Sequence, residues 1–131
     1  MTTIYRAGGV KSDTPAGFRS GWVANINDVR TVLKDNQGAD FKVSPGKTFY
    51  IGKIYFQGTG GSFFILAYDD DGAGTNEVIL LVSTQYEWVS PCYAPAQEYD
   101  CVIPVPAGKY ITCRSSGASG FIFVMLFGQE V

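Results

Sequence analysis

Histidine is absent from the 131-residue sequence. Its absence excludes Ser-His-Asp and Cys-His nucleophiles, the usual general base near neutral pH, and zinc sites with imidazole ligands. Acidic residues could still form the carboxylate pair of a glycosidase, but most of them lie in predicted turns with no sign of convergence. The glycine-rich run from Gly58 to Gly61 stands between predicted strands, so it does not resemble a phosphate loop, which precedes a helix. We therefore expect no enzyme activity, no catalytic or metal-binding residues and no cofactor.

Clustered positive charge and long apolar runs are also missing. The ten Lys and Arg residues are scattered, and the formal net charge is −2. Nucleic-acid binding needs clustered basic residues, so we do not expect a nucleic-acid partner. No apolar run approaches the ~20 residues that span a bilayer, and the N-terminus lacks the apolar stretch of a signal peptide. We expect synthesis in a cytosol and no membrane partner.

The sequence contains few cysteines, and their spacing matches no paired motif. The three cysteines, Cys92, Cys101 and Cys113, form no CxxC motif, and their number is odd. In a reducing compartment this pattern favours three free thiols in or near a β core. A Cys92–Cys101 disulfide across one loop remains an alternative, because sequence does not show whether their Cα atoms approach closely enough.

The residues that are present indicate one all-β domain. The composition is 46% apolar and 15% aromatic, with 16 glycines and 6 prolines spread along the chain. From residue 41 onward, apolar stretches separated by turn residues predict strands. They lie at about 47–57, 62–68, 77–83, 86–89, 99–103, 109–114 and 120–127. We predict an antiparallel two-sheet β-sandwich over residues 41–131, preceded by an N-terminal arm and first strands over residues 1–40.

Two segments leave alternatives open. Asn27 to Leu33 could form a helical turn or a short strand, and its β-branched residues favour the strand. The run from Asp69 to Glu77 offers oxygen ligands for Ca²⁺, but it does not match the EF-hand spacing. A solvated turn between two strands is the interpretation we favour for this run.

Three predicted strands are apolar on both faces, whereas a sandwich strand normally alternates apolar and polar residues. We therefore expect the outer face of at least one sheet to be covered by the N-terminal arm or by other subunits. For the last strand we place the larger side chains inward, although one bulge would exchange the two sets. The inward set is Phe121, Phe123, Met125 and Phe127. The set facing a partner is Ile122, Val124 and Leu126.

The runs VSPGKTFYIGKIYF and IPVPAGKYITCRSSGASGFIFVMLFGQEV resemble small single-domain jelly rolls of tailed bacteriophages. The resemblance covers about residues 41–131 and implies a sandwich of jelly-roll type. It further implies a structural virion protein, a trimeric capsid decoration (cement) protein on the capsid surface that binds the major capsid protein. The N-terminal segment would then grip the capsid or a neighbouring subunit. Its apolar anchors would be Ile4, Tyr5, Phe18 and Trp22.

The same resemblance allows a second function, a receptor- or carbohydrate-binding fibre head. Exposed aromatic side chains would act as stacking platforms for sugars. The candidates are Tyr86, Trp88, Tyr93 and Tyr99. A fibre head normally follows a repetitive shaft, and the sequence contains no such repeat, so we favour the decoration protein. A jelly-roll enzyme of the cupin type needs histidine ligands that are missing here.

Overall fold

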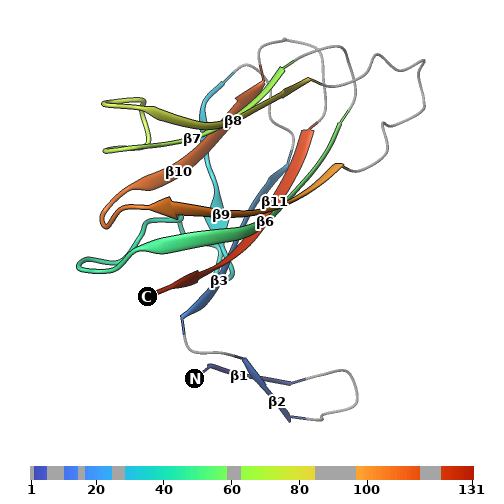
Figure 1. Cartoon of the computed structure of the whole chain (residues 1–131), viewed down its shortest axis with the longest axis vertical. Coiled ribbons are helices and arrows are strands. Elements are labelled where there is room, and N and C mark those ends of the chain that lie inside the picture. The colour runs from blue at the N-terminus through green and yellow to red at the C-terminus, as the bar shows by residue number, and fades with distance from the viewer. Residues whose placement is uncertain are drawn as a thin grey trace.

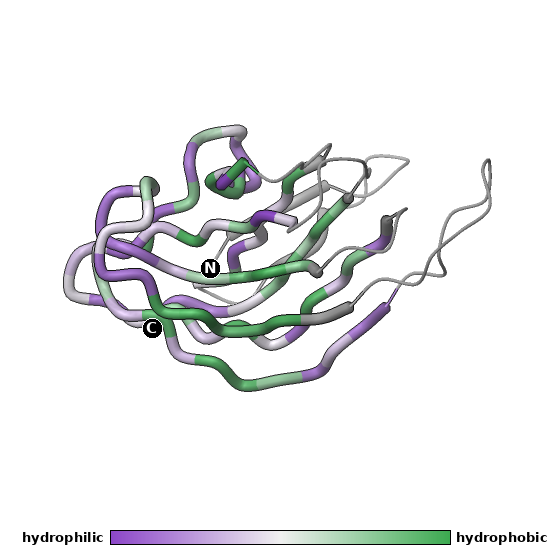
Figure 2. The backbone as a smooth tube through the Cα atoms, turned by 90° about the horizontal axis from the view of Figure 1, so that it is seen from above, coloured by the Kyte–Doolittle hydropathy of each residue, from purple (hydrophilic) through white to green (hydrophobic). Residues whose placement is uncertain are grey.

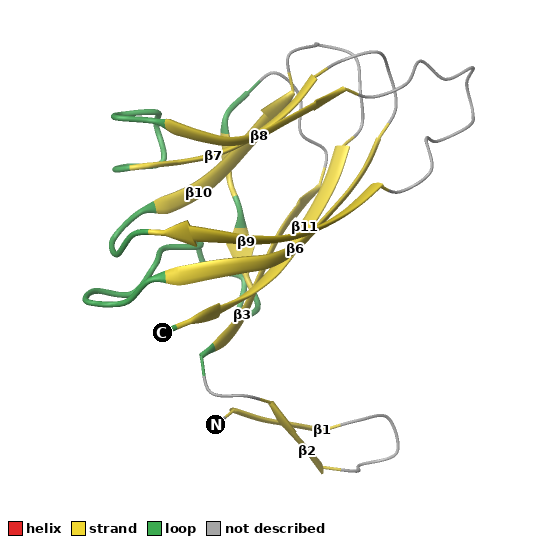
Figure 3. Cartoon of the chain, in the orientation of Figure 1, coloured by secondary structure: helices red, strands yellow, loops and turns green. Residues whose placement is uncertain are grey.

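The computed structural model describes residues 2–5, 11–14, 17–24, 29–58, 63–84, 97–115 and 122–131. All regular structure in these ranges is β-strand, as Figure 3 shows. Nothing in these ranges forms a helix long and apolar enough to cross a membrane. The predicted all-β fold is confirmed.

Two antiparallel sheets pack face to face (Figure 1). The five-stranded sheet has the order β5 (Lys34–Asp35), β3 (Phe18–Ala24), β11 (Ile122–Glu130), β6 (Phe49–Gly58), β9 (Gln97–Val105). The four-stranded sheet has the order β4 (Thr31–Val32), β10 (Tyr110–Ser115), β7 (Phe63–Asp69), β8 (Val78–Thr84). This arrangement confirms the predicted two-sheet sandwich.

The first forty residues contribute to both sheets and to a separate hairpin. Strands β3 and β5 belong to the five-stranded sheet, and β4 belongs to the four-stranded one. Strand β4 lies inside the segment for which we favoured a strand over a helical turn. Strands β1 (Thr2–Tyr5) and β2 (Lys11–Thr14) pair only with each other, and Figure 1 shows this hairpin beyond the end of β3.

The strand order follows a regular wrapping pattern. Apart from β5, the sandwich strands β3, β4, β6, β7, β8, β9, β10 and β11 can be numbered one to eight along the chain. Their order is then 1-8-3-6 in one sheet and 2-7-4-5 in the other. Every connection crosses from one sheet to the other, except the one between β7 and β8, which are neighbours in the same sheet.

Large side chains from several strands and from the loop before β6 fill the space between the sheets. Figure 2 shows hydrophobic stretches along the middle of the sandwich and hydrophilic stretches at several of the places where the chain turns. The largest fully buried side chains are Phe41, Phe49, Phe56, Phe64, Leu33, Ile51, Ile54, Leu66, Ile111 and Leu126. Four phenylalanines from other parts of the chain thus occupy the volume that we had expected β11 to fill.

The predicted orientation of β11 is wrong. Val124 and Leu126 are fully buried in the core, whereas Phe123, Met125 and Phe127 are only half-buried. Because the interior already holds the four phenylalanine rings, β11 packs there with its smaller side chains. Val124 and Leu126 are therefore core residues and do not form an interface. The side chains of Ile122 and Phe121 lie outside the described residues.

Candidate interaction face

The outer side of the five-stranded sheet carries large apolar side chains. On β3, β6 and β11 they alternate with the buried core residues. We call this set the outer aromatic face: Phe18, Trp22, Tyr50, Tyr55, Phe123, Met125 and Phe127. Phe18, Trp22 and Tyr50 are about 40% exposed, at 41%, 42% and 40%. The outer side of an antiparallel sheet is normally polar, so this face departs from the usual pattern.

Strand register explains why these side chains meet. Met125 of β11 pairs with Trp22 on one side and with Tyr55 on the other, which forms a row across three strands. Phe127 lies two residues further along β11, on the same side of the sheet. Its ring stacks on Phe18 at 6.1 Å and meets the Tyr55 ring edge-on, also at 6.1 Å. Phe127 therefore links Phe18 on β3 and Tyr55 on β6 into one aromatic cluster.

Two hollows flank Phe127 on this face. The first, of about 360 Å³, is lined by Phe18, Tyr50, Ile51, Gly52, Lys53, Cys101, Val102, Phe127, Gly128 and Gln129. The second, also about 360 Å³, is lined by Tyr55, Phe56, Gln57, Phe123, Met125 and Phe127. Both are surface depressions with mainly apolar walls, each large enough for one or two side chains of a binding partner.

A β-bulge with two glycines forms the floor of the first hollow. Lys53 pairs with Phe127 and Ile51 pairs with Gly128, so Gly52 has no partner in β11. A Cβ atom on Gly128 would lie 2.2 Å from the Tyr50 carbonyl oxygen, which only glycine avoids. A Cβ atom on Gly52 would meet nothing closer than the Phe127 carbonyl oxygen at 3.8 Å. The bulge thus leaves bare backbone where a side chain would otherwise fill the hollow.

Charged residues form a rim beside the aromatic rings. Lys53 pairs with Glu98 at 2.6 Å and with Asp100 at 3.4 Å, both on the neighbouring strand β9. The hydrogen bond from Lys53 to Glu98, with a second one to Asp100, raises the pKa of the lysine above its ordinary value. The lysine also lies 5.7 Å from the centre of the Tyr55 ring. An apolar centre with a charged rim is the pattern of protein–protein contact surfaces.

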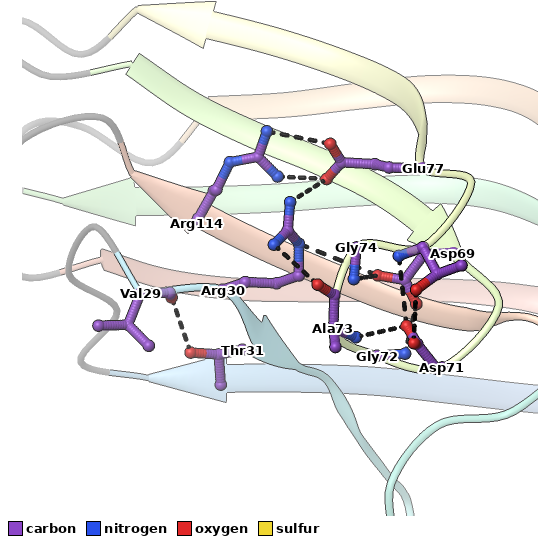
Figure 4. Close-up of polar contacts among 11 residues, drawn as sticks. Val29, Arg30, Thr31, Asp69, Asp71, Gly72, Ala73, Gly74, Glu77 and Arg114 are labelled. Atoms are coloured by element: carbon purple, nitrogen blue, oxygen red, sulfur yellow. Dashed lines mark hydrogen bonds and ion pairs between the residues drawn. The ribbon is translucent and has the colours of Figure 1, made fainter.

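On the four-stranded sheet, in contrast, the β7–β8 loop and Arg30 lie against part of the outer side (Figure 4). The loop between β7 and β8 approaches that sheet so closely that a Cβ atom on Gly72 would lie 2.8 Å from Val32. Asp69 at the end of β7 is fully buried and accepts hydrogen bonds from the amides of Gly72, at 2.5 Å, and Gly74, at 2.9 Å. The buried carboxylate therefore holds the loop in place.

An ion-pair network ties this loop to two other parts of the chain. Glu77 accepts hydrogen bonds from both terminal nitrogens of Arg114 on β10 and from Arg30, at 3.0 Å, in the segment before β4. Arg30 also donates to the Ala73 carbonyl at 3.3 Å. The Arg114 guanidinium, opposed by burial and helped by Arg30, lowers the pKa of Glu77. The network therefore fixes the β7–β8 loop and the segment before β4 against β10.

The run from Asp69 to Glu77, for which we favoured a turn over a Ca²⁺ site, uses its carboxylates for internal contacts. Asp71 accepts hydrogen bonds from the Ala73 amide, at 2.8 Å, and from the amide and hydroxyl of Thr75. Asp70 pairs with Lys109 and with the side-chain amide of Asn76. No cluster of three or more acidic or cysteine side chains suited to a metal ion occurs in the part of the chain that the structure describes. The segment is an ordered turn fixed by hydrogen bonds.

The structure brings together only some of the predicted interface residues. Phe18 and Trp22 lie on the outer aromatic face. Ile4 and Tyr5 belong to β1, but their side chains lie outside the described residues. The sequence reasoning missed Tyr50 and Tyr55, whose alternation with buried residues of β6 was the available signal. It also missed Phe123, Met125 and Phe127 as surface residues, because it assigned them to the core.

Of the predicted sugar platforms, the structure describes only Tyr99. It packs against the core, with its ring stacked on Phe56 at 5.9 Å and its hydroxyl donating to Gln97 at 2.9 Å. Tyr99 is thus not an exposed platform, because it points between the sheets. The remaining candidates, Tyr86, Trp88 and Tyr93, lie outside the described residues.

Two of the three thiols are described, and both are free. Cys113 is buried in the core and Cys101 is half-buried beside the Ile51 carbonyl. Burial raises the pKa of each thiol, so neither has the thiolate character of a reactive cysteine. The free Cys101 contradicts the alternative disulfide to Cys92, which itself lies outside the described residues.

No protein-family model matches this chain, and no curated protein shows significant similarity to it. The surfaces of the two sheets therefore carry the functional inference.

Proposed function

We propose that this protein is a structural assembly protein that binds other protein subunits through its outer aromatic face. The observation that carries the proposal is the exposure of Phe18, Trp22 and Tyr50 on one side of the five-stranded sheet, beside two hollows with mainly apolar walls. Apolar surface removed from water stabilises a contact by about 25 cal/mol per Å². Aromatic side chains dominate the binding energy of protein interfaces, and hollows beside them accept side chains of the partner.

The particular assembly we propose is the capsid of a tailed bacteriophage, with this chain as a trimeric decoration protein that binds the major capsid protein. The sequence resemblance motivates this assignment. The strand order 1-8-3-6 and 2-7-4-5 supports it. A jelly roll has eight strands in two sheets, and its successive strands alternate between the sheets in this way. A trimer that binds several identical sites on a capsid at once gains affinity from each additional contact.

A carbohydrate-binding fibre head is the second candidate. The exposed rings of Trp22 and Tyr50 favour it, because flat aromatic surfaces also stack on sugars. A sugar additionally needs hydrogen-bond partners for its hydroxyl groups, and the walls of both hollows are mainly apolar. The surface therefore suits a protein partner better than a sugar.

Sedimentation velocity of the wild type and of Trp22→Ser tests the self-association. We expect a concentration-dependent oligomer that Trp22→Ser weakens at least tenfold, while the variant still folds. Val29→Ser is the matched control, since Val29 is 65% exposed and lies away from the face. Co-sedimentation with capsid shells that lack this protein tests the capsid part. A wild type that is monomeric throughout and binds no capsid shell would overturn the proposal.

A further inference from the structure

Strand β8 forms one open edge of the sandwich. It pairs with β7 on one side, and no other described strand pairs with its second side. The main-chain N–H and C=O groups of an edge strand can pair with another extended chain.

The other three edges carry recognised protective features. Strands β4 and β5 are only two residues long. Strand β9 presents exposed Glu98, Asp100 and Pro104 along its length. Short edges, charges and proline each oppose strand pairing, because they limit or interrupt the ladder of hydrogen bonds.

Strand β8 has neither charge nor proline. Its sequence is VILLVST, seven residues in which β-branched and apolar types dominate. Three side chains are exposed: Val78 at 43%, Ile79 at 51% and Val82 at 53%. A register shift opposite Leu66 and Ala67 divides the strand at Leu80, so Leu81–Thr84 is its longer regular stretch. Exposed β-branched residues are well suited to packing across a new strand pair.

We infer that β8 pairs antiparallel with β8 of a second copy, which joins two four-stranded sheets into one eight-stranded sheet across a two-fold axis. A second copy fits because the contact is self-complementary: each protomer supplies the same uncharged strand. Since each chain has a net charge of −2, two copies approach most easily where neither presents a charge. The contact also uses the open edge of both partners, so it closes as a dimer.

This contact is independent of the outer aromatic face, which lies on the other sheet. It does not depend on the proposed function, and each contact can be lost without the other. A chain using both contacts would carry two different interfaces. Variants at Val82 and Trp22 therefore separate them.

The test is sedimentation equilibrium of the full-length Val82→Lys variant beside the wild type. A lysine on an edge strand blocks pairing, because a charge would have to enter the new sheet. We expect the association constant of the dimer to fall at least tenfold, while the variant protomer still folds. Val29→Lys is the control, since Val29 is exposed beside β4, at the opposite edge of the same sheet. This control should dimerise like the wild type.

Oxidative cross-linking of Val82→Cys gives a second measurement that does not depend on loss of association. Peptide mass spectrometry should find a covalent dimer linked through position 82 in both chains. A monomeric wild type would overturn the inference, as would a Val82→Lys variant that dimerises normally. If Trp22→Ser abolishes association and Val82→Lys does not, the β8 contact is wrong and the proposed function stands. The reverse result would support β8 pairing and contradict self-association through the outer aromatic face.

Discussion

Arg30 and Glu77 lie 47 positions apart in the sequence, and the arginine donates a hydrogen bond of 3.0 Å to the glutamate. Arg114 from β10 binds the same carboxylate. The two arginine side chains are 26% and 21% exposed, and that of the glutamate is 16% exposed. One carboxylate therefore connects the segment before β4, the β7–β8 loop and a central strand of the sheet.

We predict that Glu77→Gln destabilises the protein by about 1.5 kcal/mol at neutral pH, because two largely buried guanidinium groups lose their charged acceptor. Glu98→Gln is the control, since its side chain is 47% exposed and exposed ion pairs contribute little. Urea unfolding at pH 7 measures both variants. Equal effects of the two substitutions would contradict the prediction.

The effect of Glu77→Gln should also depend on pH. Because Arg114 and Arg30 lower the folded-state pKa of Glu77, this group stabilises the protein above its ordinary pKa of 4.5. That contribution is lost as the pH falls below 4.5 and through the lower folded-state pKa. The stability difference between wild type and Glu77→Gln should thus shrink in acid. Unfolding curves over a pH series measure it, and a constant difference would refute this role for the network.

Calcium should have little effect on thermal stability. The carboxylates of Asp70 and Asp71 already accept hydrogen bonds or ion pairs from Asn76, Lys109 and Thr75. A site binding only the folded state would add about 2.7 kcal/mol at a hundredfold excess of ligand over its Kd. Melting temperatures with and without Ca²⁺ measure this. A large rise in calcium that Asp71→Ala abolishes would show that the segment is a metal site after all.

Glycine at position 128 should be essential for the bulge. A Cβ atom there would overlap the Tyr50 carbonyl oxygen at 2.2 Å and the Phe49 ring at 2.6 Å. We expect Gly128→Ala to destabilise the fold by about 2–3 kcal/mol, since backbone and core would both have to move. Gly52→Ala is the matched control in the same bulge, where the added methyl group has room. Denaturant unfolding of both variants measures the loss of stability, and a Gly128→Ala variant as stable as the wild type would contradict the geometry.

Six of the seven strands predicted after residue 41 agree with strands of the structure, because apolar stretches alternate with glycine, proline and aspartate turns. The seventh, at 86–89, lies outside the described residues. The orientation of β11 could not be predicted from the sequence. Its residues from Phe123 to Phe127 are apolar on both faces, so alternation gives no direction. What decides it is packing between sheets: Phe49 and Phe64, remote in sequence, already occupy the interior. The ion-pair network around Glu77 could not be predicted either, because it joins segments that only the fold brings together.

The orientation of β11 leads to a last prediction, which compares two neighbouring residues. Leu126 is fully buried in the core, whereas Met125 is half-buried on the outer aromatic face between Trp22 and Tyr55. Leu126→Ala should cost about 3 kcal/mol of folding stability, because it leaves a cavity, while the remaining folded protein assembles normally. Met125→Ser should cost less stability and weaken self-association instead, since it removes apolar surface from the contact. Urea unfolding and sedimentation velocity on both variants measure the two effects. If Met125→Ser assembles like the wild type while Leu126→Ala does not, the outer aromatic face is not the contact surface.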